Sequence, residues 1–319
     1  MFDVVWKGTK MPEGQAIHRL ARLINERFEG SIVSASSPQG RFIDGARRLN
    51  GLVARRAEAW GKHFFMPFTE EEQKSAPSDG IWLGDDGPVW LHIHLGLYGR
   101  WYFTGENAGA IAGAGIRSGN HHAINLGEGS TVRLRLVGDS VAADLTGPSR
   151  CEILDGPGVG TAIAKLGPDP VRNDPGDRER FVRAVRGRKT PVGQLILDQS
   201  VAAGPGNIYR ADCLFRVGIS PLRPGNRVSP ARLGALWDDL AATMQADVPD
   251  GVIRTVPEDL RPEPVKAATG QENEQEEDAE AQRFAVYHRT GRPCLRCGTA
   301  IAEKEMAGRR LFWCPKCQR

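Results

Sequence analysis

Cys294-Leu295-Arg296-Cys297 and Cys314-Pro315-Lys316-Cys317 are two cysteine pairs near the end of the chain, separated by sixteen residues. This is the spacing of a zinc site in which two tight turns each direct two thiolates at one ion. Four thiolates complete a tetrahedron and leave no open position, so we expect one structural Zn²⁺ rather than a catalytic metal. Free buried cysteines or two redox pairs are the alternative, but the basic surroundings and the absence of a βαβ pattern favour zinc.

The segment that carries the cysteines is basic. Residues 283–319 contain nine Lys or Arg and two acidic residues, a balance of +7, whereas the whole chain carries +3. The acidic run at residues 271–278 offsets the difference. A basic terminal module indicates an acidic partner, and nucleic acid is the usual one. Arg309 and Arg310 precede Leu311-Phe312-Trp313 at the expected hairpin tip, where an arginine can fork onto phosphate oxygens.

Helical signals dominate from about residue 178 to residue 245. Leu233, Leu236 and Leu240 recur at helical spacing, and Ser229-Pro230 predicts the N-cap and first turn of that helix. Before it, the run Gln199–Arg210 ends one helix and begins another, with Asn207 as a possible cap. Amides of such a first turn can bind an anion. From this stretch alone, a helix–turn–helix that grips a phosphate backbone and an ordinary turn are equally supported.

The first half of the chain predicts an antiparallel β domain that extends to about residue 148. Residues 31–34, 89–95 and 131–137 alternate or run apolar between clusters of Gly, Asn and Asp. A helix precedes them, because Ala16, Leu20 and Ile24 share one face. The fold class is therefore α+β. The Pro-, Glu- and Gln-rich residues 257–282 predict a mobile loop.

Composition excludes several classes of protein. Hydrophobic residues make up 40% and charged residues 25% of the chain, which is ordinary globular usage. No apolar run approaches the ~20 residues that span a bilayer, and residues 1–6 lack the order of a signal peptide. We therefore expect no membrane partner and a cytoplasmic, reducing location.

Met11-Pro12-Glu13-Gly14 is the stretch with the clearest chemical potential. Proline followed by glutamate is common at a helix start. If translation began at Met11 and the methionine were removed, however, Pro12 would present a secondary amine at the chain terminus. An α-amino group has a pKa of ~7.7–8.0, so a fraction is nucleophilic at neutral pH. Such an amine can attack a sugar carbon and form an iminium intermediate, while Glu13 shuttles protons.

These features together resemble the formamidopyrimidine-DNA glycosylase/endonuclease VIII (Fpg/Nei) family. Each motif is weak by itself, apart from the cysteines, but their order and separations are specific. The resemblance covers nearly the whole chain from Met11 to Arg319. It rests on Pro12-Glu13-Gly14, Gly61-Lys62-His63, His94-Leu95-Gly96-Leu97-Tyr98-Gly99, Gly204-Pro205-Gly206-Asn207-Ile208-Tyr209 and the four-cysteine hairpin.

The resemblance implies an architecture and a division into domains. It implies an N-terminal antiparallel β-sandwich with flanking helices, a helix–two-turn–helix domain and a zinc-finger hairpin. The expected ranges are residues 1–11 for an N-terminal extension, 12–148 for the catalytic sandwich, 149–256 for the helix–two-turn–helix domain, 257–283 for an acidic flexible loop and 284–319 for the zinc finger.

The resemblance also implies roles for individual residues. Pro12 would be the nucleophile that attacks C1′ of the damaged nucleotide, and Glu13 the acid/base that assists ring opening. Lys62 would grip a phosphate beside the lesion, and Asn207 and Arg309 would clamp the backbone of a bent duplex while the base is extruded.

Leu97 and Tyr98 have two readings of equal weight. They can fill the space that the extruded base leaves, or they can be packing residues at the end of a strand.

The expected activity is that of a bifunctional DNA glycosylase and abasic-site lyase of base excision repair. Gly14 after Pro12-Glu13, and Leu97-Tyr98-Gly99, resemble the endonuclease VIII branch, which favours oxidised pyrimidines over 8-oxoguanine. After base release, β- and then δ-elimination would cut the strand on both sides of the sugar. The expected partner is double-stranded DNA with oxidised bases or abasic sites, bound by a monomer at the nucleoid.

Two departures from the family pattern leave other functions open. Ten residues precede Met11, and an acylated proline nitrogen cannot form an iminium. Ala16 stands where many members have a glutamate. A catalytically inactive damaged-DNA-binding protein and a zinc-ribbon RNA-binding protein are therefore the alternatives. His92 and His94 share a strand face and can in principle ligate a metal, but no third ligand is evident, so strand packing is favoured.

Overall fold

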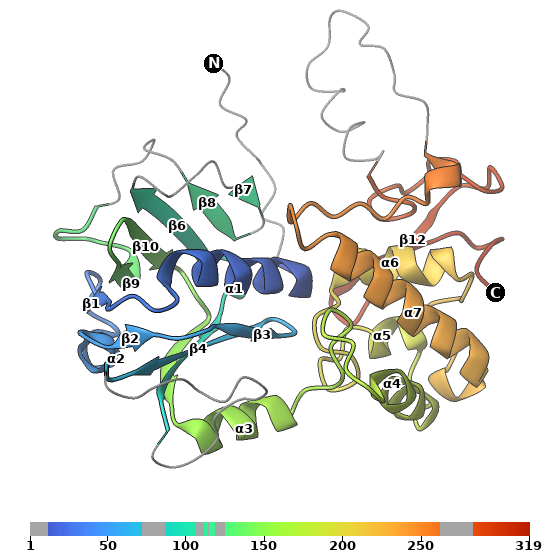
Figure 1. Cartoon of the computed structure of the whole chain (residues 1–319). Helices are drawn as coiled ribbons and strands as arrows, with labels where there is room; N and C mark the ends of the chain where they lie inside the picture. The colour runs from blue at the N-terminus through green and yellow to red at the C-terminus, as the bar shows by residue number, and fades with distance from the viewer. Residues whose placement is uncertain (1–11, 72–86, 106–111, 114, 119–124, 262–282) are drawn as a thin grey trace, which may run out of the picture. The chain divides into compact units, whose positions relative to one another are not determined.

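A computed structural model describes residues 12–71, 87–105, 112–113, 115–118, 125–261 and 283–319 (Figure 1). The N-terminal extension 1–11 and the acidic run 271–280 lie outside these residues. The chain forms two compact units. The first is Met1–Lys165 with Val248–Gly251, and the second is Leu166–Asp247 with Val252–Arg319.

Two sheets build the first unit. The six-stranded sheet has the order β1 (Ser34–Ser36), β9 (Val132–Val137), β10 (Val141–Thr146), β6 (Arg100–Gly105), β8 (Ile116–Ser118) and β7 (Ala112–Gly113). The other sheet has the order β11 (Arg150–Leu154), β5 (Val89–His94), β4 (His63–Thr69) and β2 (Val53–Ala54), with β3 (Glu58–Trp60) also paired to β4. Among the described strands every pairing is antiparallel except β6 with β8.

Both sheets share one apolar core with helix α1 (Gly14–Phe28). Leu20 and Ile24 of α1 are fully buried with Phe64 and Ile93 of one sheet and Trp101 of the other. The strands alternate between this core and the opposite face because side chains of a strand point to either side in turn. Two further helices belong to the unit, α2 (Ile43–Leu49) and α3 (Gly156–Ala164). The family expectation of a sandwich with flanking helices is confirmed.

The first unit continues past residue 148, where we expected the sandwich to end. Strand β11 pairs with β5 over its whole length, from Arg150 opposite His94 to Leu154 opposite Trp90. Helix α3 then follows, and Val159 packs with Phe65 and Trp90. The change of unit falls after Lys165, because the last strand and its helix are needed to cover the outer face of the second sheet.

The second unit is helical up to residue 260. Its helices are α4 (Asp177–Arg186), α5 (Val192–Leu195), α6 (Asn207–Arg216) and α7 (Pro230–Ala246), with the short 3₁₀ turns η1 (Gly225–Arg227) and η2 (Glu258–Leu260). Helix α7 begins as the sequence predicted, because the Ser229 side chain accepts a hydrogen bond from the Arg232 amide and Pro230 follows it. Helix α5 is one turn long, so the apolar run that continues to Val201 is mostly turns.

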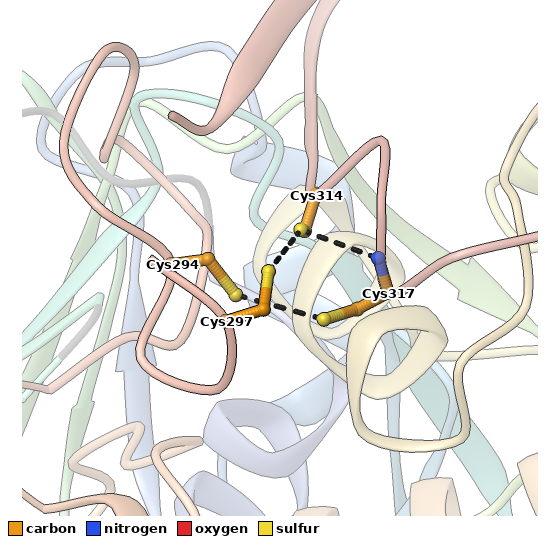
Figure 2. A group of neighbouring side chains, drawn as sticks. All are labelled: Cys294, Cys297, Cys314 and Cys317. Atoms are coloured by element: carbon orange, nitrogen blue, oxygen red, sulfur yellow. Dashed lines mark hydrogen bonds between the residues drawn. The ribbon is translucent and has the colours of Figure 1, made fainter. Parts of the chain in front are cut away.

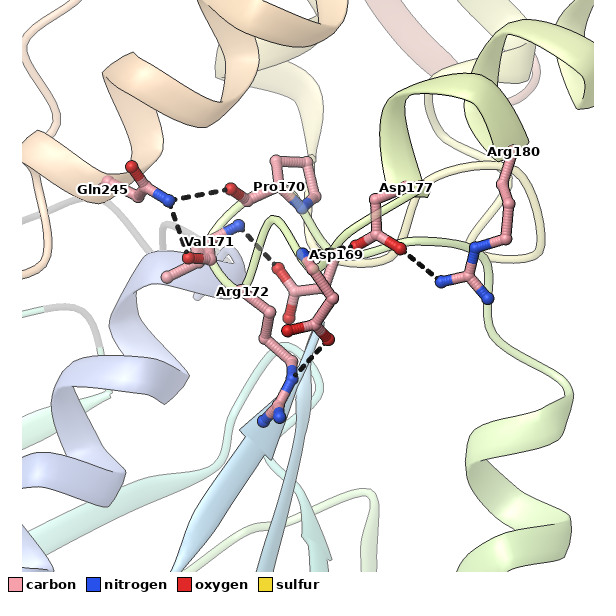
Figure 3. Close-up of polar contacts among 8 residues, drawn as sticks. Asp169, Pro170, Val171, Arg172, Asp177, Arg180 and Gln245 are labelled. Carbon is pink, nitrogen blue, oxygen red and sulfur yellow. Dashed lines mark hydrogen bonds and ion pairs between the residues drawn. The ribbon is translucent and has the colours of Figure 1, made fainter. Parts of the chain in front are cut away.

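A polar turn leads the chain into α4 (Figure 3). Asp169 is buried and accepts a hydrogen bond from the Val171 amide at 2.8 Å. Asp177, also buried, accepts from the Asp174 amide at 3.0 Å and pairs with Arg180. The Gln245 amide of α7 donates to the Val171 carbonyl at 3.0 Å. These bonds supply partners for backbone N–H and C=O groups of a turn that belongs to no helix or sheet.

Strands β12 (Ala302–Met306) and β13 (Arg309–Trp313) form the terminal hairpin, which packs on α6. Helix α6 is buried on all sides from Ile208 to Phe215. Asp212 at its centre has no exposed surface, and its carboxylate accepts hydrogen bonds from the amides of Ala285, Val286 and Tyr287 at 2.7, 3.0 and 2.9 Å. The Thr255 hydroxyl donates to the same group. Helix α6 and the terminal hairpin module therefore share one buried core and hydrogen-bond network.

The α+β fold class is confirmed. In the described residues, no helix is long and apolar enough to cross a membrane.

Substituting Asp212 tests the attachment of the hairpin. Asp212→Ala removes the acceptor of three buried amides, and an unmade buried hydrogen bond costs ~1–3 kcal/mol. Because three amides lose their acceptor together, we expect the free energy of unfolding of the second unit to fall by about 3 kcal/mol or more, in urea titrations followed by circular dichroism. The control Asp238→Ala removes an exposed partner of Arg178 and should leave the midpoint unchanged. Equal effects of the two variants would contradict the role of Asp212.

Candidate DNA-binding and catalytic site

The four cysteines converge on one point, as their spacing predicted (Figure 2). Their sulfur atoms all lie within 4.8 Å of one another. The Sγ atoms of Cys294 and Cys317 are 3.9 Å apart, and those of Cys297 and Cys314 are 3.6 Å apart. A tetrahedron of sulfur atoms at ~2.3 Å from a zinc ion has edges of about 3.8 Å. The donor set and its size fit one structural Zn²⁺ with no position left for substrate.

Each cysteine turn is also attached to the helical body. Arg296, between the first two cysteines, donates to the carbonyls of Phe215 and Arg216 at 2.8 and 3.0 Å and lies over the Phe215 ring. Gln318, next to the last cysteine, accepts from the Cys314 amide at 2.8 Å and donates to the Ile219 carbonyl at 3.0 Å. A cation at the last carbonyls of a helix is electrostatically favourable. Hydrogen bonds therefore attach the two cysteine turns to the C-terminal end of α6 and the residues that follow it.

Arg309 lies at the tip of the hairpin and is exposed. The turn before it is Ala307-Gly308, with φ of 53° and 69°, as in the two-residue turns that suit twisted hairpins. The neighbouring Arg310 is committed to Glu303, with 2.7 Å between Nη2 and Oε2. Hydrogen bonds from Arg310 and then Thr290 lower the pKa of Glu303 to about 2. Phe312, expected near the tip, is instead buried in the core of the module.

Asn207 opens α6 and faces the hairpin. The N-cap position is taken by Gly206, so Asn207 is the first helical residue and not the cap. Its Nδ2 donates to the Arg310 carbonyl at 2.9 Å, and Arg210 Nη2 donates to the same oxygen at 2.8 Å. The first residue of α6 is therefore hydrogen-bonded to strand β13 at Arg310, the residue after Arg309.

Pro12 and Glu13 lie at the start of α1 in the first unit, and both are buried. A Cβ added at Gly115 would lie 3.1 Å from Pro12 Cγ and 2.8 Å from Leu95 Cδ1, so the Pro12 ring and the Leu95 side chain both lie beside Gly115, between β7 and β8. Glu13 is the N-cap of α1, but its side chain makes no capping hydrogen bond to the described first turn. The Glu13 residue is 4% exposed, so its carboxyl lies in the interior of the first unit.

Gln15 is a residue of this region that the sequence did not single out. It lies in the first turn of α1 with no exposed surface, and neither Oε1 nor Nε2 has a hydrogen-bond partner within the described part of the chain. A buried amide without partners costs ~1–3 kcal/mol. The only available signal was its position, three residues after Pro12.

Lys62 lies on the turn between β3 and β4, as expected, with Gly61 at φ 56°. Its charge lowers the pKa of His63 and His94, although burial is the larger cause for both. Leu97 and Tyr98 lie on the turn after β5 and are 46% and 68% exposed. Their exposure favours a surface role over packing at the end of a strand.

His92 and His94 belong to no converging group of three or more metal ligands within the part of the chain that the structure describes. The four cysteines are the one group of three or more potential ligands that converge among the described residues. His92 hydrogen-bonds Glu152 and His63 instead, and His94 Nδ1 lies 2.8 Å from Ser149 Oγ. The contacts of both histidines are therefore hydrogen bonds to other side chains of this face, Glu152, His63 and Ser149.

Three family models match the chain in succession. They describe the formamidopyrimidine-DNA glycosylase N-terminal domain over residues 11–138, the formamidopyrimidine-DNA glycosylase H2TH domain over residues 166–256, and the zinc finger found in FPG and IleRS over residues 291–319.

Curated relatives and solved structures agree with these matches. The chain is 40% identical to Endonuclease 8 1 of Mycobacterium tuberculosis over 97% of its own length and all of the relative. It is 32% identical to the formamidopyrimidine-DNA glycosylase of Novosphingobium aromaticivorans over 85% of this chain and 94% of the relative. MutM bound to DNA that contains carbocyclic 8-oxo-G shares the fold, with a TM-score of 0.67 and 20% identity over 97% of this chain and 100% of that one.

The chain belongs to the formamidopyrimidine-DNA glycosylase/endonuclease 8 family. It is a DNA glycosylase family member that acts in the repair of oxidative DNA damage, with one structural zinc in its terminal hairpin.

Removal of the metal tests the dependence of the hairpin on zinc. Cys314→Ser removes one of the four zinc ligands, so we expect loss of the bound zinc. We also expect the dissociation constant for an abasic-site duplex to rise by about 10-fold or more, as for a lost charged contact of ~1.5–3 kcal/mol. Zinc is measured by atomic emission and binding by fluorescence anisotropy. The control Cys151→Ser changes a cysteine of β11 and should retain one zinc per chain. One full equivalent of zinc in the Cys314→Ser protein would refute the four-cysteine site.

Proposed function

We propose that this protein is a bifunctional DNA glycosylase and abasic-site lyase that excises oxidised bases, with the secondary amine of Pro12 as nucleophile. The observation that carries the proposal is the position of Pro12. Its ring and the side chain of Leu95 both lie beside Gly115, Leu95 precedes the exposed Leu97 and Tyr98, and Glu13 is buried directly after Pro12. A nucleophile, a proton carrier and an apolar wedge thus come from two adjoining segments of one unit.

The proposed chemistry needs an unacylated Pro12. Its nitrogen attacks C1′ of the extruded nucleotide, and the glycosidic bond breaks with its electron pair leaving on the base, which takes up a proton. Glu13 protonates O4′ as the sugar ring opens, and an iminium forms. Loss of a C2′ proton then expels the 3′ phosphate, and the second elimination expels the 5′ phosphate.

The phosphate contacts are proposed for Lys62 in the first unit and for Asn207 and Arg309 in the second. Each fits the chemistry, since Lys62 is a cation on a turn and Asn207 keeps a second Nδ2 hydrogen beyond the one given to Arg310. Extrusion of the base leaves a gap in the stack, and Leu97 with Tyr98 are the exposed apolar side chains that we assign to it.

Oxidised pyrimidines are the proposed lesions. Gly14 and Leu97-Tyr98-Gly99 support this choice, as does the 40% identity to a protein named endonuclease 8, against 31–33% for the formamidopyrimidine-DNA glycosylases matched over most of the chain. We further propose that the protein acts as a monomer on double-stranded DNA in the cytoplasm, at the nucleoid.

The residues before Pro12 decide between two functions. The match to the N-terminal-domain model begins at residue 11, which supports Met11 as the functional start. If Pro12 stays acylated, the same grip would serve a catalytically inactive protein that binds damaged DNA, since none of the proposed phosphate contacts uses the Pro12 nitrogen.

Borohydride trapping on abasic-site DNA tests the nucleophile. The chain that starts at Pro12 after removal of Met11 should form a covalent crosslink, because borohydride reduces the iminium. The chain that retains residues 1–11 should form none, and Pro12→Gly should lose most of the crosslink yet still bind the duplex. The yield is read by denaturing gel electrophoresis.

The trapping series also contains its own refutation. A crosslink of undiminished yield from a protein whose intact Met1 terminus is verified by mass spectrometry would exclude Pro12. With the processed chain, duplexes that carry an oxidised pyrimidine should be cut faster than those with 8-oxoguanine, and the reverse order would overturn the choice of lesion.

Arg309→Ala tests the hairpin contact. We expect abasic-duplex binding to weaken about 10–100-fold, as for a charged hydrogen bond of ~1.5–3 kcal/mol, and the slope of log K against log salt to become shallower by ~0.9. Arg47→Ala removes one exposed positive charge from α2 and serves as the charge-matched control, with an unchanged slope. If both variants change the slope equally, Arg309 makes no specific phosphate contact.

A further inference from the structure

Strand β11 is an edge strand of the second sheet. Its one neighbour in the strand order is β5, whereas the opposite edge of the sheet, at β2, is extended by a bridge between Ile32 and Val53. Within the described part of the chain, no further backbone hydrogen bond reaches residues 150–154 from the side away from β5. Main-chain N–H and C=O groups of an edge strand that point away from its neighbour are a template for another strand.

A groove of about 640 Å³ runs along this edge. One wall of the groove is β11, through Cys151, Glu152 and Ile153, and the other is formed by residues 40–48, which include α2. The three strand residues are each partly exposed, whereas the four central residues of the neighbouring strand β5 are buried. A strand of this length extends roughly 17 Å. The groove therefore has the length and the free strand edge that an extended peptide segment requires.

The wall opposite β11 has its own anchors. The Gln39 amide donates to the Val132 carbonyl of β9 at 2.8 Å. The Phe42 ring lies against α2, because a Cβ added at Gly45 would come within 2.2 Å of Phe42 Cε2. The backbone bonds of this segment go to β9 and to its own turns and not to β11. The two walls are thus held separately, and the edge of β11 stays available between them.

Apolar side chains make up part of the lining. Phe42 is buried against the core of the first unit, and Ile153 packs partly against the same core. Ile43, the first residue of α2, is 43% exposed, which is unusual for a large apolar side chain next to a groove. An apolar side chain of a bound segment would remove this surface from water.

The polar part of the lining has an excess of positive charge. Its two carboxylates are already paired, Asp44 with Arg47 at 3.3 Å and Glu152 with Arg150 at 3.0 Å. Two further arginines of the lining, at positions 41 and 48, are exposed and have no ion-pair partner among the described residues. Unpaired guanidinium groups beside an apolar surface favour a partner that carries carboxylates.

We propose that the groove between β11 and α2 binds an extended acidic segment of another protein, which joins the second sheet as an additional strand. Main-chain hydrogen bonds to a sheet edge supply affinity in this mode, and side chains at alternate positions supply specificity. Apolar side chains of the segment contact Phe42, Ile43 and Ile153, and its carboxylates pair with Arg41 and Arg48. Nucleic acid is also acidic, but it has no peptide groups that could extend the sheet.

Titration with a model peptide tests the chemistry of the groove. The probe is a fluorescein-labelled peptide in which aspartate alternates with isoleucine and valine, added to the full chain and followed by fluorescence anisotropy. We expect saturable binding to the wild type and none for the same peptide with lysine in place of aspartate. The double variant Arg41→Glu/Arg48→Glu should raise the dissociation constant about 10-fold, because two exposed ion pairs are replaced by two repulsions.

Two single variants complete the titration. Ile43→Ser removes apolar surface without changing charge and should weaken binding about 3-fold. The control Arg22→Glu reverses an exposed charge on α1, outside the groove, and should leave the dissociation constant unchanged. Equal effects of Arg22→Glu and of each arginine reversal in the groove would show attraction to the overall charge of the protein and would overturn the site.

An N-methyl scan of the peptide tests strand addition with the wild-type protein. Methylation of one amide removes a donor and leaves the side chains and the net charge as they were. Only alternate residues of a strand bond to a given neighbour, so methylation at every second position should weaken binding about 10-fold, and methylation at the positions between should have little effect. Hydrogen–deuterium exchange should show protection of residues 150–154 on peptide binding and no change at β2.

The contrary outcomes are equally specific. Absence of saturable binding at millimolar peptide, or a scan without alternation, would overturn the proposal. So would an oligothymidylate whose binding is weakened by Arg41→Glu/Arg48→Glu while peptide binding is not, because the groove would then be a nucleic-acid contact. The groove contains none of the residues assigned to the lyase or to the grip on DNA. Failure of borohydride trapping would therefore remove the proposed nucleophile and leave the peptide measurements intact.

Discussion

The second unit depends on the way in which α6 is enclosed. A helix buried on all sides is usually apolar, yet α6 carries Asp212 at its centre, and a buried charge is expensive unless it is hydrogen-bonded. Here the carboxylate accepts from three successive amides at residues 285–287, which lie just before the first cysteine turn. The same helix is bound to the hairpin at Asn207 and to a cysteine turn at its last carbonyls. Zinc joins the two cysteine turns of the hairpin, and the hydrogen bonds to α6 fix the orientation of the hairpin within the second unit.

Local signals in the sequence predicted the features that depend on short spacings. The two cysteine pairs predicted the metal site, and Ser229-Pro230 predicted the start of α7. Local sequence signals gave wrong or no predictions where a residue's contacts come from parts of the chain that are distant in sequence. Asn207 is a good N-cap residue by type, but Gly206 takes that position and the amide of Asn207 is used by the Arg310 carbonyl. The role of Asp212 has no local signal at all, since its acceptor atoms are matched by amides more than seventy residues away.

In the first unit, too, one strand could not be predicted from its local sequence. Alternation in residues 89–95 predicted a strand with His92 and His94 on one face, and that was correct. The partner Glu152 belongs to β11, sixty residues further on and past the boundary expected at residue 148. A strand that completes a sheet edge is short and has little pattern of its own, so pairing with β5 reveals it and composition does not. Only the strand register shows that His92 and Glu152 lie opposite each other on this face of the sheet.

The proposed chemistry and the proposed grip are separable because different kinds of groups carry them. The nucleophile is one nitrogen whose reactivity depends on a covalent bond to residue 11, and no rearrangement of the fold can replace a missing lone pair. The phosphate contacts rest on side chains of turns and of a zinc hairpin whose positions come from hydrogen bonds within their own units. Changes at sites without shared partners act independently. Under the proposed mechanism, loss of the free Pro12 nitrogen would remove the lyase chemistry and leave the proposed grip on DNA in place.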